Sequence, residues 1–378
     1  MKKYQRCTRC IMDNRSDEHI TFNEKGQCNY CTTALSMYDK VYYPNNKGQI
    51  EIQKLITRLK NENKKKTYDC IMGVSGGLDS SYLLYLGYKW GLRILAIHVD
   101  DGFDTEISIS NLEKLSKATN IEIVNVKPDL VQFYELTKAY MRAGVPNLAV
   151  MQDNMTLKVL FDYARKTKIK TFLSGGNFAL ESILQQGNSY TTNDVVNIKA
   201  INRKFGSGPI NKLKFISSFQ RLWYQKVYKI EYIRPLNFIN YNKNVAMKEL
   251  SEFCGFSYYG SKLHENLFTK FLQIYWFVKK FNVDKRTSHL SSLIISDQMT
   301  RDEALIEMNK PLYDEIEMQN EISTMLNILN MSQQEFVDIM NQPAHQHTDY
   351  KTSRFEDYWN IIRRIRNYFR LGKKNGKH

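Results

Sequence analysis

The sequence predicts an α/β fold built on a doubly wound parallel sheet. Two observations predict it: short apolar segments alternate with amphipathic segments from residue 67 to residue 242, and a Ser-Gly-Gly turn directly follows the first apolar segment. A third observation sets the amino-terminal part aside, because residues 1–45 hold four of the six cysteines. We therefore expect four units: a cysteine module (1–45), a helical linker (46–66), an α/β domain (67–242) and a helical carboxy-terminal region (243–378).

The expected elements follow from hydrophobic periodicity. Apolar runs predict strands at 70–74, 94–99, 121–126 and 171–174, with a fifth near 230–233, and amphipathic runs predict helices at 79–89, 106–118, 129–142 and 155–167. One apolar face also predicts a helix over 50–63, and capping boxes predict helix starts at Thr300 and Ser332. The segment 185–218 holds Gly206, Gly208 and Pro209, so we expect an irregular loop that covers the site.

The chain is strongly basic, with 54 Lys and Arg against 39 Asp and Glu and a formal charge of +15. This charge either favours anionic partners (nucleotides, nucleotide sugars, RNA or acidic lipid) or serves solubility alone, and the sequence leaves both open. No apolar run approaches the roughly 20 residues of a membrane span, and no signal-like segment opens the chain, so a cytoplasmic protein without a membrane span is expected. The basic stretch 363–378 predicts an exposed tail or a contact with acidic lipid or a partner.

The segment 75–81 has the composition of a phosphate-binding loop. Gly76 and Gly77 allow a sharp turn and a close approach of backbone N–H groups to a phosphate, and the helix that follows adds its positive end. Serine hydroxyls would donate to phosphate oxygens, and the carboxylate of Asp79 would hold Mg²⁺ against the pyrophosphate. A Walker loop is excluded, because its Gly-Lys-Ser/Thr ending is absent. The alternative is an ordinary glycine-rich turn capped by Asp79.

The Ser-Gly-Gly-Leu-Asp-Ser string of this loop resembles the PP-loop of the N-type ATP pyrophosphatases, which have an adenine nucleotide alpha-hydrolase-like fold. The resemblance implies cleavage of ATP between its α and β phosphates through an adenylylated intermediate, with Asp79 and Ser80 as catalytic residues. Asp100 follows the second strand and is expected near the nucleotide, with a role in the turn as the alternative. The expected ATP-binding residues are Ser75, Gly76, Gly77, Asp79, Ser80, Ser81, Asp100, Gly175 and Gly176.

Two Cys-x-x-Cys pairs near the amino terminus predict a metal site. Cys7 with Cys10 and Cys28 with Cys31 have the spacing of a tetrahedral Cys₄ site. Four thiolates leave no open coordination position, so the expected Zn²⁺ is structural. Four unrelated buried cysteines and an iron–sulfur cluster are the alternatives.

Most of the chain resembles the N-acetyl sugar amidotransferases of acetamidino-sugar biosynthesis, which serve bacterial surface polysaccharide and flagellin glycan pathways. The resemblance rests on the cysteine pairs, the 75–81 loop, a Gly-Gly-Asn element at 175–177, and the segments 264–271 and 284–290. It implies that the acetamido oxygen of a nucleotide-linked or acidic sugar attacks the α-phosphate of ATP, and that ammonia then displaces AMP. It also implies a partner, a separate glutaminase that resembles the histidine-biosynthesis pair, as the ammonia source.

Polar residues beyond the sheet are candidates for sugar binding. The expected substrate contacts are Asn177, Glu181, Lys262, His264, Lys285 and Arg286, with Lys270 and His289 nearby in the sequence. Solvated helix edges and a satisfied core histidine explain the cationic residues equally well. Two rival functions are a thiolase-like tRNA-modifying enzyme and a non-catalytic zinc scaffold that senses nucleotide. No cysteine pair stands in the middle of the chain, which weakens thiolation, so a nucleic-acid partner is not expected.

Overall fold

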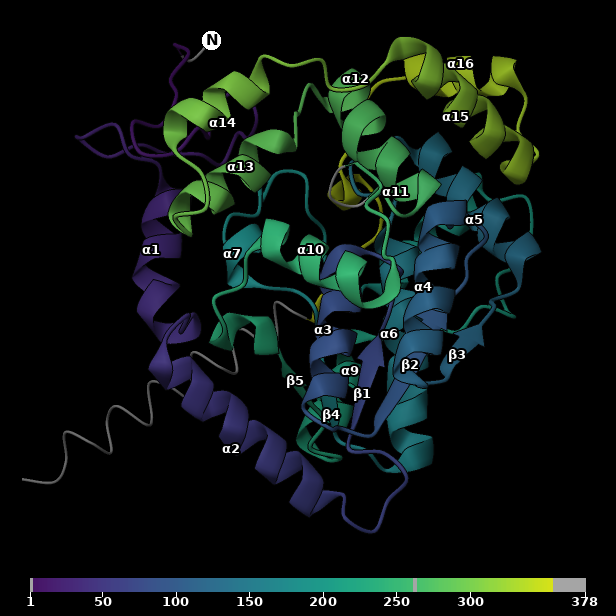
Figure 1. Cartoon of the computed structure of the whole chain (residues 1–378). Helices are drawn as coiled ribbons and strands as arrows, with labels where there is room; N and C mark the ends of the chain where they lie inside the picture. The colour runs from purple at the N-terminus through teal and green to yellow at the C-terminus, as the bar shows by residue number, and fades with distance from the viewer. Residues whose placement is uncertain (1–2, 261–263, 356–378) are drawn as a thin grey trace, which may run out of the picture.

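A five-stranded sheet forms the centre of the molecule. The computed structural model describes residues 3–260 and 264–355. The strand order is β3-β2-β1-β4-β5, and every neighbouring pair is parallel (Figure 1). The strands are β1 Cys70–Gly73, β2 Ile94–Val99, β3 Ile123–Val126, β4 Thr171–Leu173 and β5 Glu231–Ile233. The predicted α/β fold with a parallel sheet is therefore confirmed.

Helices cover both faces of the sheet. Successive side chains of a strand point to opposite faces, so Cys70 and Met72 pack in one apolar cluster with α3 (Leu78–Lys89) and α4 (Glu106–Thr119). Ile71 packs in another cluster with α6 (Val150–Thr167). The strand order changes direction between the neighbours β1 and β4. In an open α/β sheet, such a switch creates a crevice beyond the carboxyl ends of the strands.

The amino-terminal helices extend the first apolar cluster along one side of the molecule. α1 (Asn29–Val41) and α2 (Asn46–Glu62) run down this side in Figure 1, and their buried residues join the cluster under α3. α2 begins before the expected 50–63 because the side chain of Asn45 caps it, accepting from the N–H of Lys47 at 3.0 Å. The short α7 (Phe178–Glu181) and α10 (Lys243–Cys254) pack in the same cluster.

A second apolar core joins α5 (Leu130–Ala143) to the carboxy-terminal helices. Trp276 is fully buried in it, and its indole N–H donates to the carbonyl of Val145 at 3.0 Å. The helices α13 (Arg286–Ile295) and α14 (Arg301–Met308) pack instead on the cysteine module through Ile11. The remaining elements of this region are α11 (Leu267–Phe271), the π-helical turn η2 (Leu272–Trp276), α12 (Phe277–Phe281), α15 (Glu315–Leu329) and α16 (Gln333–Asn341).

The capping boxes that were expected in this region mark real helix starts. Thr300 caps α14 with both halves of the box formed, and Ser332 caps α16 by accepting from the N–H of Glu335 at 3.1 Å.

The expectation of an irregular loop over 185–218 is wrong in its middle. The helix α8 (Val195–Phe205) lies there and packs against α5. Asp194 caps it by accepting from the N–H of Asn197 at 2.9 Å, and Ile198 and Ile201 are buried. Val195, Ile198, Ile201 and Phe205 recur at helical spacing, so the sequence does carry a signal for this helix, which the glycines and the proline that follow it obscured. The helix α9 (Ser218–Lys226) begins where the expected loop ends.

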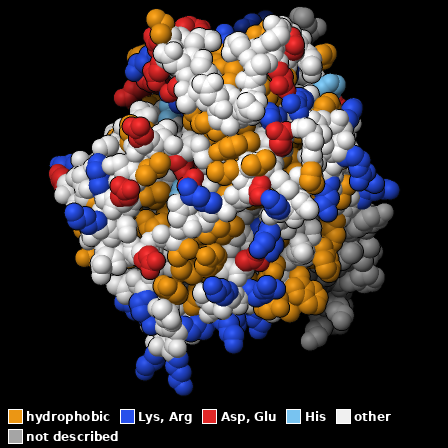
Figure 2. All heavy atoms as spheres, turned by 90° about the vertical axis from the view of Figure 1, so that its right-hand side faces the viewer, with side chains coloured by type: hydrophobic (Ala, Val, Ile, Leu, Met, Phe, Trp, Pro, Cys, Tyr) orange, Lys and Arg blue, Asp and Glu red, His pale blue; other side chains and the backbone are white. Residues whose placement is uncertain are grey.

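The surface mixes charged and apolar side chains. Figure 2 shows the face at the right of Figure 1, where Lys and Arg stand among hydrophobic and acidic residues, with a basic fringe along the lower edge. Within residues 3–260 and 264–355, no helix is both long enough and apolar enough to cross a membrane. The basic stretch 363–378 lies outside the described residues.

Replacing Trp276 by Ala should lower the free energy of unfolding by about 3 to 5 kcal/mol, because it empties a large site in a packed core. Urea denaturation followed by circular dichroism measures the change. Ile316→Ala on α15 is the control, since that side chain is 75% exposed, and it should change the value by less than about 0.5 kcal/mol. Equal small effects of both would contradict a core shared by α5 and the carboxy-terminal helices.

Candidate active site

The loop after β1 is closed by its own backbone and hydroxyl groups. The N–H of Ser75 donates to Ser80 Oγ, and the N–H of Gly77 donates to Ser75 Oγ, both at 3.2 Å. Gly76 has a φ of +74°, and a Cβ at this position would lie 2.4 Å from the carbonyl oxygen of Ser108, so only glycine fits. Gly77 supplies no side-chain cap to α3. The N–H of Leu78 donates to the hydroxyl of Tyr259 at 2.8 Å, and Leu78, Asp79 and Ser80 of the first turn line a cavity at the strand switch.

The turn after β4 lies directly against this loop. A Cβ on Gly175 would stand 2.9 Å from both the carbonyl carbon of Asp79 and the amide nitrogen of Ser80. Asn177 supports the turn, because its Nδ2 donates to the carbonyl of Gly175 at 3.2 Å while its Oδ1 accepts from the N–H of Leu180 at 2.9 Å. Asn177 is fully buried and caps α7. It positions the turn and does not line a cavity.

Two adjoining cavities open at this edge of the sheet. The smaller one, 170 Å³, lies on the loop after β1 and also reaches Gly176 and Glu181. The larger one, 580 Å³, lies over the ends of β1, β2 and β4 and extends to the carboxy-terminal region. Ser75, Gly175 and Glu265 line both cavities, so they stand at the junction.

Glu265 brings a carboxylate from the carboxy-terminal region onto the loop. Its Oε1 accepts from Ser75 Oγ at 3.3 Å, and a Cβ on Gly77 would lie 2.4 Å from the same oxygen. Its backbone carbonyl accepts from the N–H of Thr105 at 3.1 Å, and a β-bridge joins Asp104 to Asn266. In the sequence, Glu265 lies in the segment 264–271, for which only cationic residues were predicted to contact the substrate.

A buried tyrosine orients Asp79. The hydroxyl of Tyr241 donates to Asp79 Oδ1, and the backbone carbonyl of Tyr241 accepts from Gln298 Nε2 at 2.8 Å. Burial and the neighbouring Asp79 charge raise the pKa of Tyr241 well above its usual value, so the phenol stays a donor. No local sequence signal announces this pair, since 162 residues separate its members.

The wall of the larger cavity holds satisfied acidic groups. His98 Nε2 lies 2.9 Å from Asp104 Oδ2, and His98 Nδ1 lies 2.9 Å from the carbonyl oxygen of Val74. Burial lowers the pKa of His98, but the hydrogen bond and charge of Asp104 outweigh it and leave that pKa raised. Burial, followed by the Asp104 charge, raises the pKa of Asp101 to about 6, although Asn266 and Gln152 both donate to its carboxylate.

Three of the expected ATP-binding residues, Gly76, Ser81 and Asp100, line neither cavity. Asp100 pairs with Lys127 at 2.9 Å and accepts from the N–H of Gly102 at 3.1 Å, which matches the turn role that the sequence left open. Ser81 is fully buried on α3, and its hydroxyl has no hydrogen-bond partner among the described residues.

The expected substrate contacts separate in the same way. Lys285 lines the larger cavity. Arg286 is occupied elsewhere: its guanidinium pairs with Asp284 at 2.7 Å and donates to the carbonyls of Glu307 and Lys310 at the end of α14. His264 lines neither cavity, and burial lowers its pKa to about 4.

Two further cationic candidates do not line either cavity. Lys270 pairs with Glu317 and Glu321 on α15, and His289 lines neither cavity. Lys262 lies outside the described residues.

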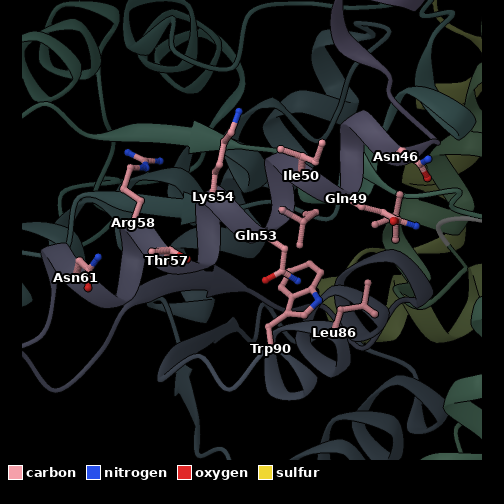
Figure 3. Close-up of a pocket in the computed structure, with 12 residues that line it drawn as sticks. Asn46, Gln49, Ile50, Gln53, Lys54, Thr57, Arg58, Asn61, Leu86 and Trp90 are labelled. Atoms are coloured by element: carbon pink, nitrogen blue, oxygen red, sulfur yellow. The ribbon is translucent and has the colours of Figure 1, made fainter.

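A third cavity, 960 Å³, lies away from this edge. Figure 3 shows Lys54 and Arg58 of α2 on its wall, with Leu86 and Trp90 from the end of α3. None of the described residues that line it belongs to the phosphate loop, and none is an acid, a histidine, a cysteine or a serine. We assign no chemistry to it.

Sequence profiles of known families match two parts of the chain. Residues 69–258, half of the chain, match the family described as queuosine biosynthesis protein QueC. The chain belongs to the PP-loop ATP pyrophosphatases. Residues 265–366 of this PP-loop protein match the C-terminal domain of WbpG-like LPS biosynthesis proteins. A comparison with curated proteins found no match.

Two solved structures are similar to the PP-loop protein at low identity. The U34-tRNA thiolase NcsA from Methanococcus maripaludis with its 4Fe-4S cluster is 15% identical, with a TM-score of 0.33, over 82% of this chain and 90% of that chain. The NH3-dependent NAD synthetase from Campylobacter jejuni is 14% identical, with a TM-score of 0.29, over 71% of this chain and 99% of that chain. At these scores the likeness carries no argument about activity.

The four amino-terminal cysteines of the PP-loop protein form one cluster. Cys7 Sγ lies 3.6 Å from Cys31 Sγ, Cys10 Sγ lies 3.6 Å from Cys28 Sγ, and all four sulfurs lie within 4.8 Å of one another. Thiolates that share one tetrahedral ion at about 2.3 Å would be about 3.8 Å apart, so the cluster could hold one Zn²⁺. A multi-iron cluster would bind each thiolate to a separate iron and needs a wider cage.

The cysteine cluster is tied to the edge of the larger cavity. Arg301 donates to the carbonyls of Cys7 and Cys10, both at 3.2 Å. Gln185 Nε2 donates to the carbonyl of Ser16 at 3.2 Å, just beyond the second cysteine. The segment that follows Gln185 includes Asn188, which lines the larger cavity. A metal in the cluster would therefore stabilise the rim of the larger cavity without contacting any molecule bound in that cavity.

Cys10→Ser should abolish metal binding and lower the melting temperature, because a structural metal contributes its binding free energy to folding. Plasma mass spectrometry of the purified protein identifies and counts the metal. Cys254→Ser is the matched control, since Cys254 lies at the end of α10 and outside the cluster. Metal content that is unchanged in Cys10→Ser would rule out the four-cysteine site.

Proposed function

We propose that this chain is an ATP-dependent amidotransferase that converts an acetamido group of a sugar into an acetamidino group through an O-adenylyl imidate. The observation that carries the proposal is the pair of adjoining cavities, of which one lies on the PP-loop and the other reaches the carboxy-terminal region. The match of that region to a WbpG-like LPS biosynthesis domain supports a sugar substrate. We propose a nucleotide-linked or acidic sugar of surface polysaccharide or flagellin glycan.

The cavities suggest how ATP would bind. The pyrophosphate would occupy the smaller cavity, and the adenosine would lie along the apolar wall of the larger one, formed by Ile97, Leu160 and Phe172. The α-phosphate would then stand at the junction, beside Ser75 and Gly175. Serine hydroxyls and the positive end of α3 would stabilise the charge that develops on the departing pyrophosphate.

The smaller cavity also fits Mg²⁺. Asp79, Glu181 and Glu265 line it, and carboxylate oxygens are the ligands that Mg²⁺ prefers. Bound Mg²⁺ would neutralise charge on the phosphate oxygens. Carboxylates and a polyphosphate repel one another in a shared cavity unless a cation lies between them, so we propose that Asp79 holds the ion and that Tyr241 keeps this carboxylate in place.

The transfer would proceed in two steps. The acetamido oxygen attacks the α-phosphorus, the bond to pyrophosphate breaks, and the acetamido N–H proton passes to water, which leaves a neutral imidate. Ammonia then attacks the imidate carbon and AMP leaves. Two of the expected sugar contacts line the cavities: Glu181 lines the smaller one and Lys285 lines the larger one. We propose that these two residues bind the sugar.

The ammonia would come from another protein. A glutaminase thiol needs a lowered pKa and a neighbouring base. Four of the cysteines form the cluster, and burial raises the pKa values of the other two, Cys70 and Cys254. We therefore propose a separate glutaminase as partner, and the cytoplasm, where ATP is available, as the place of reaction.

A tRNA-modifying enzyme is the alternative. The charge of +15 and the queuosine biosynthesis family of residues 69–258 are in keeping with it. Thiolation by a pair of cysteines has less support, because no cysteine is found among the described residues that line either cavity.

Measuring pyrophosphate release distinguishes the two functions. The protein is supplied with ATP, Mg²⁺ and ammonium, and acetamido sugars, their nucleotide-linked forms and bulk tRNA are compared as acceptors. The proposal expects AMP together with a sugar product in which NH has replaced one oxygen, detected by mass spectrometry. Turnover with tRNA alone would move the chain to RNA modification.

Asp79→Asn should lower the rate of pyrophosphate release by at least about 100-fold, because the isosteric amide removes the charge that holds the metal. Tyr241→Phe keeps the carboxylate but removes its donor, and should cost about tenfold. Asp302→Asn, on the exposed side of α14, is the control and should keep the full rate. Equal rates for Asp79→Asn and the control would exclude Asp79 from the reaction.

A further inference from the structure

One face of α6 lines the larger cavity from its base to its mouth. Asp153, Thr156, Leu157 and Leu160 all line it, and their spacing of three and four residues places them on one side of the helix. Leu160 lies at the base, where its side chain stands 3.5 Å from the Cβ position of Gly73 on β1. At 1.5 Å per residue, Asp153 lies about 10 Å further out. The base is therefore apolar, while the outer part carries a carboxyl group.

The side-chain carboxylate of Asp153 makes no hydrogen bond or ion pair with the described residues. Its side chain is accessible, and the surface that it exposes lines the cavity. The protein atoms around the carboxyl group in the cavity wall raise its pKa to about 6 by partial desolvation, with no contribution from a neighbouring charge. A carboxylate in such a place is stabilised by a cation or by hydrogen-bond donors.

Gln273 adds a second free acceptor to the same cavity. It lies in the π-helical turn η2 and lines the cavity, and its buried Oε1 has no hydrogen-bond partner in the described structure. Trp276 of the same turn bonds to Val145, and Val150 at the start of α6 packs in the same apolar core. The two elements that carry Asp153 and Gln273 therefore contribute to the same apolar core, and both residues line the same cavity. Single π-helical turns are frequent at functional sites.

The other acidic groups of this cavity already have partners. Asp101 accepts from Asn266 and Gln152, Asp104 pairs with His98, and Glu265 accepts from Ser75. Lys285 Nζ lies 5.2 Å from the ring centroid of Phe277, and burial lowers its pKa to about 8.

Ammonium matches the two free acceptors. It carries a positive charge and four N–H donors and has no acceptor of its own, whereas the outer cavity offers a carboxylate and an amide oxygen. A sugar hydroxyl would bring no charge to compensate Asp153.

We propose that Asp153 and Gln273 bind the nitrogen nucleophile as ammonium at the outer end of the larger cavity. This inference rests on the proposed amidotransferase function. Ammonium gives one proton to the Asp153 carboxylate, and the lone pair of the resulting ammonia forms a C–N bond with the imidate carbon. One of its protons passes to the imidate nitrogen, the C–O bond breaks, and AMP leaves with the electron pair. An amidinium remains, and Asp153 releases its proton to water.

Rubidium tests binding without any need for turnover, since Rb⁺ is close to ammonium in size and charge. Crystals of the whole protein soaked in rubidium chloride should show an anomalous peak beside Asp153 and Gln273 that ammonium chloride displaces. Asp153→Asn should lose the peak. Asp162→Asn, on the same helix but paired with Lys158 outside the cavity, should keep it. A wild-type crystal without the peak overturns the proposal.

Kinetics test the role in the reaction. Asp153→Asn should raise the KM for ammonium at least about tenfold, as removal of a charged hydrogen-bond partner does. The exchange of labelled pyrophosphate into ATP, which needs the sugar but no ammonium, should stay within about twofold of wild type. An unchanged KM for ammonium, or a parallel loss of exchange, contradicts the assignment.

The two proposals fail in different ways. If wild-type protein shows no sugar-dependent exchange, the amidotransferase function fails while the rubidium result still reports on the cation site. If exchange is normal and Asp153→Asn behaves as Asp162→Asn does, the function stands and the ammonium site falls. Melting temperatures guard against misfolding: Asp153→Asn should melt no lower than wild type, because it removes an uncompensated carboxylate.

Discussion

The contact between Gly175 and the backbone of Asp79 and Ser80 is the constraint on which the site depends. Because residue 175 has no side chain, the turn after β4 can lie against the first turn of α3. This contact sets the width of the crevice at the strand switch and keeps the two cavities joined. Asn177, buried behind the turn, holds Gly175 and begins α7, which ends at Glu181. One close approach of backbone to backbone thus places both the loop and a carboxylate.

Parts of the chain that are distant in sequence meet at this edge of the sheet. The carboxy-terminal region contributes Glu265 through its bridge to the segment after β2, and Gln273 through the π-helical turn. The cysteine module reaches the same edge indirectly, through the bond from Gln185 to Ser16. Loss of the metal should therefore disturb the cavity rim as well as the module. The PP-loop and the carboxy-terminal region line one cavity, and this is why we propose that both act on one reaction.

The sequence predicted those features that local patterns encode. Short runs of residues are enough to predict the strands, the loop at 75–81 and the cysteine pairs. The backbone geometry of the strands and the loop, and the positions of the cysteine sulfurs, depend little on the rest of the chain. Tyr241 was missed because only tertiary packing brings it to Asp79. Arg286 was expected to contact the substrate because the sequence does not show which partners a cation has. In the structure, Arg286 pairs with Asp284 and donates to a carbonyl at the end of α14. No sequence pattern marks Asp153 either, because only the folded structure places this residue in the wall of the larger cavity.

The central claim is that ATP activates the acetamido oxygen itself. The most direct measurement uses an acceptor whose acetamido carbonyl carries ¹⁸O, with ATP, Mg²⁺ and ammonium, and determines the mass of the AMP. The account predicts that the label moves from the sugar to the phosphate of AMP, because the C–O bond breaks after the oxygen has bonded to phosphorus. Unlabelled AMP formed together with an amidinated sugar would contradict the adenylyl imidate and require another route.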